Sequence, residues 1–521
     1  MKELLHKGLH ITMSLAFGML LASEALGETD ETEKVEKMES ITVTARKAEE
    51  SAKNVPFSLT VIDDMELENR RLKNFEDALR QTPGVEIQTY GSLNTDVMRI
   101  RGVGSLYQIG MDDTSVLLNL DGVPQSLGMA SMSIMDIERV EVMKGPQGTL
   151  MGRNSEAGAV NIVTKKPTRH PEAYIKGEYG TRNTFDLEAA ASGPATETLS
   201  ARLAAKYSGY DNQVEYYSTG APISEPRDVA VRGTLLWEPT EKTDATLSLG
   251  YEEKNDRTEA MLLMPYDDDP KIDMPEGGLD ADKDSQRATL DITHEFDNMM
   301  FTSVTGYTGM DSSEDRLLYD RTIANTLLGM DSTEGDFTLR EMSADTLYQE
   351  FRLSSKPEDD VFWVAGFNFY QSDRNLTNSY DYEHIMGYMA MNGSIDSNFK
   401  TTDYAVFGEA TYPLTDRFKL TGGLRYTWDN KEYESDWMPA ATNPFAGYYG
   451  PASDSDEMDS SFLTGRASVS YAVSDNINTY FTYARGHKAK AYQDLATEYI
   501  FLGDNADLVV DAATIDSYEL G

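Results

Sequence analysis

Residues 137–165 read IERVEVMKGPQGTLMGRNSEAGAVNIVTK. The first six combine branched apolar side chains with charged ones, which predicts a short strand that ends at Lys144-Gly145-Pro146. Residues 159–164, which are rich in branched side chains, predict a second strand that stops before Lys165-Lys166-Pro167. Glycines crowd the segment between the two strands, where they favour tight turns and a close approach of the backbone to a neighbouring surface.

The glycine-rich segment allows a second interpretation, a phosphate-binding loop. Such a loop needs a lysine and a hydroxyl residue directly after its last glycine, because these two side chains contact the phosphates and the bound metal ion. Here Arg153-Asn154 follow Gly152. We therefore do not expect a nucleotide site.

The stretch closes a region of short mixed elements at 54–167. Asp63 or Asp64 can cap a first helix, and Thr82-Pro83-Gly84 ends a second one. Strands are predicted at 56–62, 85–87, 97–101 and 116–120, and helices at 65–70 and 74–80. This mixture predicts a compact α+β domain.

Two segments precede this domain. Basic residues lead into an apolar run at 11–22, and small residues at Ala25 and Gly27 provide a cleavage site. Because about 12 apolar residues are too few to span a membrane, residues 1–27 are predicted to be a signal peptide. Residues 28–53 are charged and lack aromatic side chains, which predicts a disordered leader.

Beyond the mixed domain, residues 172–521 alternate apolar and polar side chains with a period of two, as a strand with one apolar face does. Leu424, Tyr426 and Trp428, for example, alternate with Arg425 and Thr427. The pattern predicts about 14 strands of about ten residues, the length that a tilted strand needs to cross a bilayer.

The connections between these strands alternate in length. Short polar turns occur at 238–242, 413–416 and 474–476, and long loops lie between them, among others at 311–344, 372–401 and 430–460. Outer-membrane barrels sort their connections in this way, with short turns on one side and long loops on the other. The predicted fold class is therefore mainly β, with an N-terminal α+β domain followed by a large antiparallel transmembrane β-barrel.

The composition narrows the function. Acidic residues number 88 against 46 basic ones, a formal net charge of −42 that would repel a nucleic-acid partner. The chain has no cysteine, which excludes disulfides, thiolate metal sites and cysteine nucleophiles. Its low mean hydropathy excludes a helical membrane protein but not a barrel, because only alternate residues of a barrel strand face lipid.

The motifs of the N-terminal domain resemble, in content and order, those of the plug of TonB-dependent receptors. The segment Ile41-Thr42-Val43-Thr44-Ala45 is similar to the TonB box of that family. The plug motifs are Val55-Pro56-Phe57-Ser58, Leu79-Arg80-Gln81-Thr82-Pro83-Gly84-Val85, Ile100-Arg101-Gly102-Val103-Gly104, Leu120-Asp121-Gly122-Val123-Pro124 and the stretch 137–165. The barrel resembles the family more weakly, through Tyr483-Ala484-Arg485-Gly486 and Ser517-Tyr518-Glu519-Leu520-Gly521.

The resemblance implies an active transporter of the bacterial outer membrane, with a plug at 54–167 inside a barrel that starts at 172. The substrate would bind outside, between the long loops and the plug. The inner-membrane TonB complex would capture the box at 41–45 as an added strand and pull it. The family further implies a monomer in contact with membrane lipid, without enzymatic activity, cofactor or resident metal.

Charged residues of the plug region are expected to contact the barrel. Arg99, Arg101, Glu138, Arg139 and Glu141 place both signs of charge on short strands. An acid–base pair is the alternative, but the sequence offers no Ser-His-Asp spacing and no His-x-x-x-His pair. We interpret the five residues as polar contacts between the plug and the polar interior of the barrel.

The substrate is the least determined feature. A ferric siderophore is the commonest substrate in the family, and aromatic faces and hydroxyl groups suit a bulky organic chelate. Tyr90, Tyr107 and Gln108, in the presumed apical loops, are the predicted contacts. Cobalamin, haem and a glycan stay open as substrates. A passive porin is the alternative class, but it would lack both a plug and a TonB box.

The last expectation concerns the end of the barrel. A family barrel has about 22 strands, whereas about 14 are visible here and the chain stops at Gly521 without an aromatic residue. Residues 172–521 are therefore expected to form a partial barrel whose last strands are missing.

Overall fold

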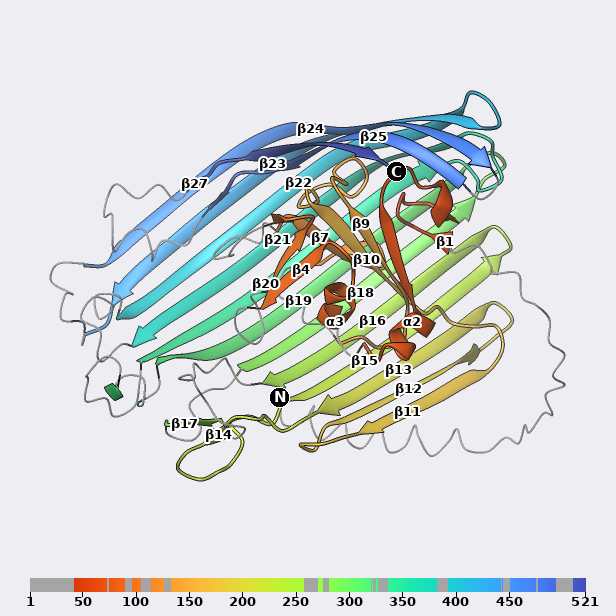
Figure 1. Ribbon diagram of the computed structural model, residues 1–521. Helices are drawn as coiled ribbons and strands as arrows, with labels where there is room; N and C mark the ends of the chain where they lie inside the picture. The colour runs from red at the N-terminus through yellow and green to blue at the C-terminus, as the bar shows by residue number, and fades with distance from the viewer. Residues whose placement is uncertain are drawn as a thin grey trace. The chain divides into compact units, whose positions relative to one another are not determined.

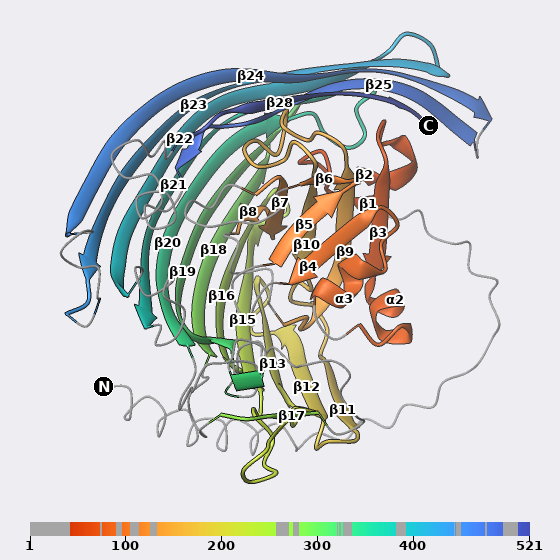
Figure 2. The ribbon, with the colours of Figure 1, turned by 60° about the vertical axis from the view of Figure 1, so that its left-hand side comes forward.

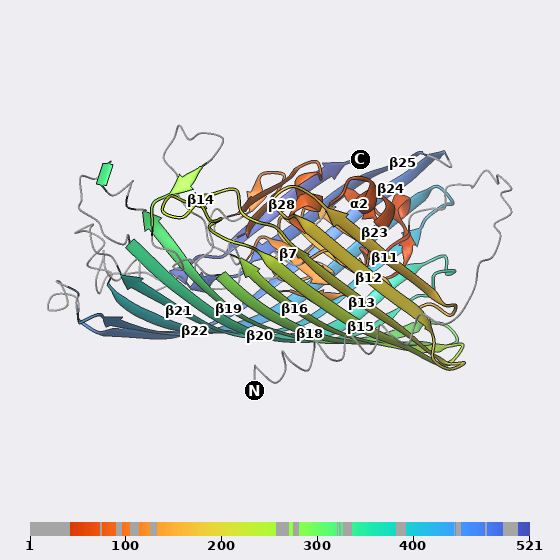
Figure 3. The same ribbon diagram turned by 90° about the horizontal axis from the view of Figure 1, so that it is seen from below.

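The period-two part of the chain forms one antiparallel sheet of 14 strands in the computed structural model. Figure 1 shows these strands side by side, tilted in a common direction, and Figure 3 shows the same tilt from below. The structure describes residues 42–72, 75–89, 96–104, 114–125, 133–256, 270–274, 281–319, 321, 325–326, 336–381, 392–441, 443, 450–474, 477–492 and 509–521. The predicted fold class and the predicted strand number are thereby confirmed.

Each strand of the large sheet pairs with its neighbours in sequence, through antiparallel ladders. The strands are β11 (Glu172–Tyr179), β12 (Phe185–Pro194), β13 (Leu199–Gly209), β15 (Arg227–Thr240), β16 (Thr243–Asp256), β18 (Ala281–Glu295), β19 (Met300–Tyr319), β20 (Asp336–Ser354), β21 (Phe362–Asp381), β22 (Gly393–Pro413), β23 (Phe418–Pro439), β24 (Ala452–Ser474), β25 (Ile477–Lys488) and β28 (Ala513–Leu520). Two small pairs lie outside this sheet: β14 (Glu215–Tyr216) with β17 (Lys271–Ile272), and β26 (Ala491–Tyr492) with β27 (Val509–Val510).

Side chains alternate between the two faces of the sheet. On β23, Arg425 and Thr427 are buried on the inner face, whereas Leu424 and Trp428 are 61% and 47% exposed on the outer face. Large apolar side chains occupy outer positions of other strands too, for example Leu203 on β13 and Leu463 on β24. An exposed apolar outer face and a polar inner face are what the barrel prediction requires.

Strands β19 to β24 differ from the prediction in length. They run for 19 to 23 residues rather than about ten. The ladder between β22 and β23 continues past Trp428 to Pro439, while the outward side chains become charged, at Glu432, Glu434 and Asp436. The loops predicted at 311–344, 372–401 and 430–460 were therefore too long, because the end of the apolar pattern marks the end of the apolar band and not of the strand.

The plug is built around the stretch 137–165, which forms the antiparallel pair β9 (Ile137–Lys144) and β10 (Gly158–Thr164). A five-stranded sheet has the order β3-β9-β10-β7-β8, and a three-stranded sheet has the order β4-β5-β6. The remaining elements are β3 (Leu59–Asp63), α2 (Asp64–Asn69), α3 (Phe75–Arg80), β4 (Val85–Thr89), β5 (Asp96–Ile100), β6 (Val103–Gly104), β7 (Val116–Leu120) and β8 (Val123–Pro124).

Local signals explain the short helices. The Asp63 side chain caps α2 by accepting a hydrogen bond from the backbone N–H of Glu66 at 2.7 Å. Phe75 and Leu79 of α3 are fully buried and pack with Ile100, Val140 and other plug residues. Figure 2 shows the plug on the concave side of the 14-stranded sheet.

The described part of the leader is folded. β1 (Thr42–Val43) pairs with β2 (Glu50–Ser51), and a short 3-10 helix, η1 (Ala52–Asn54), leads to the plug. Composition predicts disorder up to residue 53, but burial of side chains against the plug orders this segment. The signal peptide and residues 28–41 lie outside the described residues. Within the described part of the chain, no helix has the length and apolar character to cross a membrane.

Candidate functional site

Residues 42–51 form a hairpin, hereafter the leader hairpin, that lies against the plug. The chain reverses near Lys47, whose φ is +64° and whose backbone N–H donates to the Thr44 carbonyl at 2.9 Å. Val43 and Ala45 are fully buried in an apolar cluster with plug residues such as Phe57 and Met143. Of the predicted TonB box, Val43 and Ala45 are therefore sequestered and Thr44 is half-buried, whereas Thr42 is exposed and Ile41 lies outside the described residues.

Glu141 of β9 fastens the hairpin to the plug. Its carboxylate accepts the backbone N–H of Thr44 at 2.9 Å and the Thr44 hydroxyl at 3.2 Å. Arg139 donates to the same carboxylate at 2.8 Å, and Asn161 of β10 donates to the Thr44 hydroxyl at 3.1 Å. Glu141 is fully buried, so these donors are what stabilise its charge.

Two leader cations contact the inner barrel wall. Arg46 donates to Glu409 of β22 at 2.7 Å, and its guanidinium carbon lies 3.9 Å from the centre of the Phe362 ring. Lys47 lies 2.9 Å from Glu350 of β20. Burial lowers the pKa of Lys47, and Glu350 opposes that shift. Burial likewise raises the pKa of Glu50 in β2, opposed by Arg46.

Each of these barrel carboxylates also has an arginine of the barrel beside it. Arg466 of β24 lies 3.6 Å from Glu409, and Arg352 lies 2.8 Å from Glu350. Removing one partner of a buried ion pair ordinarily costs about 3–5 kcal/mol, because a bare charge is left behind. With a resident arginine at each carboxylate, the hairpin can leave without that full cost.

Of the five charged residues predicted to join plug and barrel, Arg101 contacts a barrel strand. It lies 2.7 Å from Glu519 of β28. Arg139 contacts Glu138 and Glu141, which are both in the plug. Arg99 lies 4.0 Å from Glu86 of the neighbouring plug strand. The role of these residues as a set stays a prediction.

The glycine-rich segment 145–157 packs on the inner faces of β22 to β25. Gly145 and Gly152 have φ of +85° and +91°, as their turns require. The Thr464 hydroxyl donates to the Gly148 carbonyl at 3.1 Å, and Arg466 donates to Gln147. A Cβ at Gly148 would lie 3.2 Å from the Thr464 Cβ, so only glycine fits without a shift.

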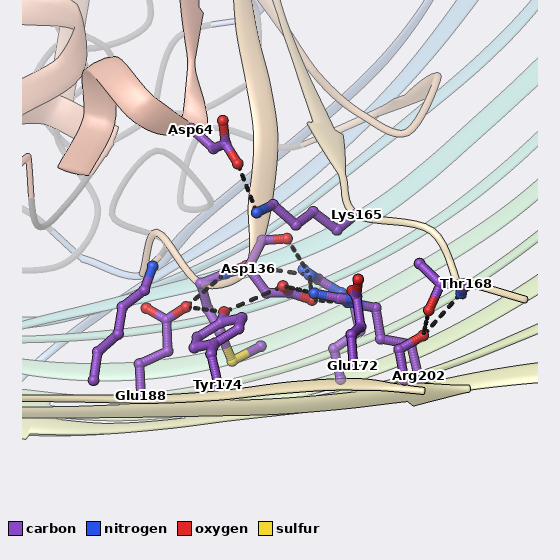
Figure 4. Close-up of polar contacts among 12 residues, drawn as sticks. Asp64, Asp136, Lys165, Thr168, Glu172, Tyr174, Glu188 and Arg202 are labelled. Carbon is purple, nitrogen blue, oxygen red and sulfur yellow. Dashed lines mark hydrogen bonds and ion pairs between the residues drawn. The ribbon is translucent and has the colours of Figure 1, made fainter. Parts of the chain in front are cut away.

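Asp136, which sequence reasoning missed, joins the other side of the plug to the barrel (Figure 4). Its buried carboxylate accepts Arg202 of β13 at 2.7 Å and Arg232 of β15 at 3.2 Å. Its backbone N–H donates to Glu188 of β12 at 3.1 Å. Figure 4 shows Tyr174, Glu188 and Arg202 converging on Asp136 from the barrel sheet.

The predicted substrate contacts Tyr90, Tyr107 and Gln108 lie outside the described residues. Among the residues that the structure describes, no three His, Asp or Glu side chains are grouped closely enough to hold a metal ion.

Two family models match the chain. The TonB-dependent Receptor Plug Domain matches residues 51–159, and the TonB dependent receptor-like beta-barrel matches residues 237–521. The chain belongs to the TonB-dependent receptors. Members of this family are outer-membrane transport receptors rather than enzymes, and the receptor described here is accordingly an outer-membrane protein.

Individual relatives resemble this receptor over most of its length. The pesticin receptor of Yersinia pestis is 26% identical over 534 residues, which cover 97% of this chain and 70% of the relative. The ferrichrome outer membrane transporter/phage receptor of Escherichia coli is 23% identical, over 85% of this chain and 62% of the relative.

Solved structures share the receptor's fold. The ferric yersiniabactin uptake receptor FyuA from Yersinia pestis has a TM-score of 0.76 at 22% identity and covers 89% of this chain and 69% of its own. The siderophore receptor PiuA from Acinetobacter baumannii has a TM-score of 0.69 at 17% identity and covers 92% of this chain and 71% of its own.

Proposed function

We propose that this receptor imports a ferric siderophore across the outer membrane, in a cycle that TonB drives. The observation that carries the proposal is the leader hairpin, whose Val43–Ala45 segment is held against the plug and whose Arg46 and Lys47 contact the barrel, all through contacts that can be released. A passive pore has no use for such a segment.

Capture by TonB requires the hairpin to open. An added strand forms backbone hydrogen bonds along an exposed edge, but Thr42 and Val43 already pair with Ser51 and Glu50. The backbone pairing covers only two residue pairs. The other polar contacts of the hairpin are with the carboxylates of Glu141, Glu350 and Glu409. Binding of substrate above the plug would shift the hairpin toward its open form, and TonB would trap that form.

The substrate class is supported by the relatives. Their names include a ferrichrome transporter, a ferric-pyoverdine receptor and a ferric yersiniabactin uptake receptor. We propose a ferric chelate of this kind for the present receptor, bound outside the plug with Tyr90, Tyr107 and Gln108 as contacts. Cobalamin, haem and glycans are the competing outcomes of the test.

The test compares the growth of an iron-starved strain that lacks this receptor with the growth of the same strain carrying the receptor gene. The panel contains ferrichrome, ferric pyoverdine, ferric yersiniabactin, ferric alcaligin and a ferric catecholate, with haem, cobalamin and an oligosaccharide as separate arms. We expect one ferric siderophore to restore growth, and deletion of residues 41–45 to abolish the rescue. Rescue that survives this deletion would indicate a passive pore. A response to haem, cobalamin or the oligosaccharide alone, with the last two tested in cells starved of that nutrient, would replace the proposed substrate.

A further inference from the structure

A cavity of about 740 Å³ separates the plug from one sector of the barrel wall. The barrel side consists of inner-face residues near the short-turn ends of the strands, such as Asp244 of β16, Asp291 of β18 and Thr302 of β19. The plug side includes the Asp121-Gly122 turn between β7 and β8. The turn between β20 and β21, at 355–361, also borders the cavity, which places it at the periplasmic end of the barrel.

The leader hairpin forms the third side of this cavity. Thr42, Thr44 and the consecutive residues 46–51 all line it. Arg46 and Lys47 cross from the plug to β22 and β20, so they bridge the gap that the cavity occupies. Withdrawal of the hairpin would therefore remove a wall and both bridges together.

A second, separate cavity of about 40 Å³ lies further toward the outside and shares Asp121 with the first. It is lined by Ser248 and Gly250 of β16 and by Thr289 of β18, and on its other side by β15 with Arg232, so it borders the sector that Asp136 fastens. Its far end is closed by Arg287, 3.4 Å from Glu252. Space for a few water molecules already exists along β16 and β18 before any movement.

The sectors on either side are fastened instead. On β12, β13 and β15, Asp136 binds Glu188, Arg202 and Arg232. On β22 to β25, polar contacts hold the glycine-rich segment to the wall: the Thr464 hydroxyl donates to the Gly148 carbonyl at 3.1 Å, and Arg466 donates to Gln147. Between these sectors, Val123 makes apolar contact with Val304, Tyr348 and Tyr370, which separates more readily than buried ion pairs do.

We propose that the cavity is the periplasmic mouth of the transport route, that the route follows the inner faces of β16, β18 and β19, and that the leader hairpin is its removable wall. This inference rests on the proposed function and adds the path. TonB then has one mechanical task, which is to withdraw the hairpin, and the plug can stay attached to the barrel at both fastened sectors while the substrate passes between them.

Cysteine labelling tests the route, because the chain has no cysteine of its own. Thr302→Cys places a thiol on the proposed route, at a position that is 6% exposed. Ser468→Cys is the matched control on β24, a small hydroxyl residue that is 4% exposed on the fastened side. Ser51→Cys reports on the hairpin itself. Each variant is labelled in cells with a small charged maleimide that enters the periplasm, in the presence of the pooled ferric siderophores.

We expect energised cells to label Ser51→Cys and Thr302→Cys about tenfold faster than cells treated with a protonophore, because labelling follows the open fraction. Ser468→Cys should not change. Suppose that energising the cells speeds labelling of Ser51→Cys but speeds labelling of Thr302→Cys no more than that of Ser468→Cys. The proposed route is then wrong, while coupling to TonB stands. If the hairpin thiol itself does not respond, the proposed function fails and the route fails with it.

Discussion

At the scale of single residues, Asp136 is the anchor that motif reading overlooks. Its two barrel arginines lie 66 and 96 positions away in sequence, so no local pattern connects them. Arg101 was accessible to prediction because it lies in a recognisable motif, and it reaches Glu519. Arg46 and Lys47 left a weaker signal, two adjacent cations in an acidic leader. Buried carboxylates whose partners come from distant strands appear only when the fold is known.

Asp136→Asn should loosen the plug. Asparagine accepts the φ of +52° at this position, so the substitution removes the charge with little strain. Arg202 and Arg232 would then lose a buried carboxylate, a change that costs about 3–5 kcal/mol. We expect the purified variant in detergent to lose plug resistance to protease at a lower temperature than the parent. Glu138→Gln, at a side chain that is 46% exposed, should match the parent, and equal losses in both variants would contradict the anchor.

Arg466→Met should make the leader hairpin harder to withdraw. Without Arg466, departure of Arg46 leaves the fully buried Glu409 with no cation from either source. We expect slower maleimide labelling of Ser51→Cys in the Arg466→Met background, in cells without energy. Adding Glu409→Gln should cancel the effect, because no carboxylate is left to compensate. Faster labelling in the Arg466→Met variant would show that Arg466 holds the hairpin in place and does not serve to neutralise Glu409 after Arg46 leaves.

At the scale of elements, the short plug strands followed from local sequence, whereas the barrel strands were underestimated. The stretch 137–165 carries its own strand residues and turn glycines, and β9 and β10 form where the pattern places them. In β19 to β24 the hydrogen-bond ladder extends beyond the apolar band. The alternation of apolar and polar side chains depends on what the outer face of the strand contacts. The alternation therefore ends where that face leaves the lipid, although the backbone hydrogen bonds between strands continue.

The outer face of β23 around Glu434 should therefore be in water. Glu434 is exposed and faces outward ten residues beyond Leu424, on the same strand and face. In whole cells, a membrane-impermeant maleimide should label Glu434→Cys and leave Leu424→Cys unlabelled. Detergent extraction should make both thiols reactive. Protection of Glu434→Cys in cells, with reaction in detergent, would mean that the apolar band reaches higher than proposed.

At the scale of the whole molecule, the plug is attached to the barrel unequally around the described wall. Two cysteine pairs can test which contacts have to open. A Cβ at Gly306 would lie 3.1 Å from that of Val123, on the proposed route, and a Cβ at Gly148 would lie 3.2 Å from that of Thr464, on the fastened side. Both distances are slightly below the usual disulfide spacing of about 3.8 Å, so the pairs are matched in strain.

We expect the Val123→Cys/Gly306→Cys disulfide to stop uptake of the ⁵⁵Fe-loaded siderophore that supports growth, and a reductant to restore it. The Gly148→Cys/Thr464→Cys disulfide should leave most of the uptake intact. Both proteins are compared with their reduced forms and with each single cysteine. Equal inhibition by the two disulfides would mean that the plug moves as one body.

The place of β3 in the plug determines how the molecule responds to force. β3 is the edge strand of the five-stranded sheet, and it follows the leader directly in the chain. Once the hairpin is withdrawn, further tension acts first on residues 55–58, where Thr482 of β25 donates to the Pro56 carbonyl and Arg466 lies over the Phe57 ring. It then reaches Leu59, which pairs with Met143 at the end of the ladder. The ladder then peels open one residue pair at a time toward Asp63 instead of shearing along its whole length, so modest tension is enough. The neighbouring strand β9 continues into the glycine-rich segment, which is bonded to β24. The rest of the sheet is therefore held in place while β3 is pulled away from it.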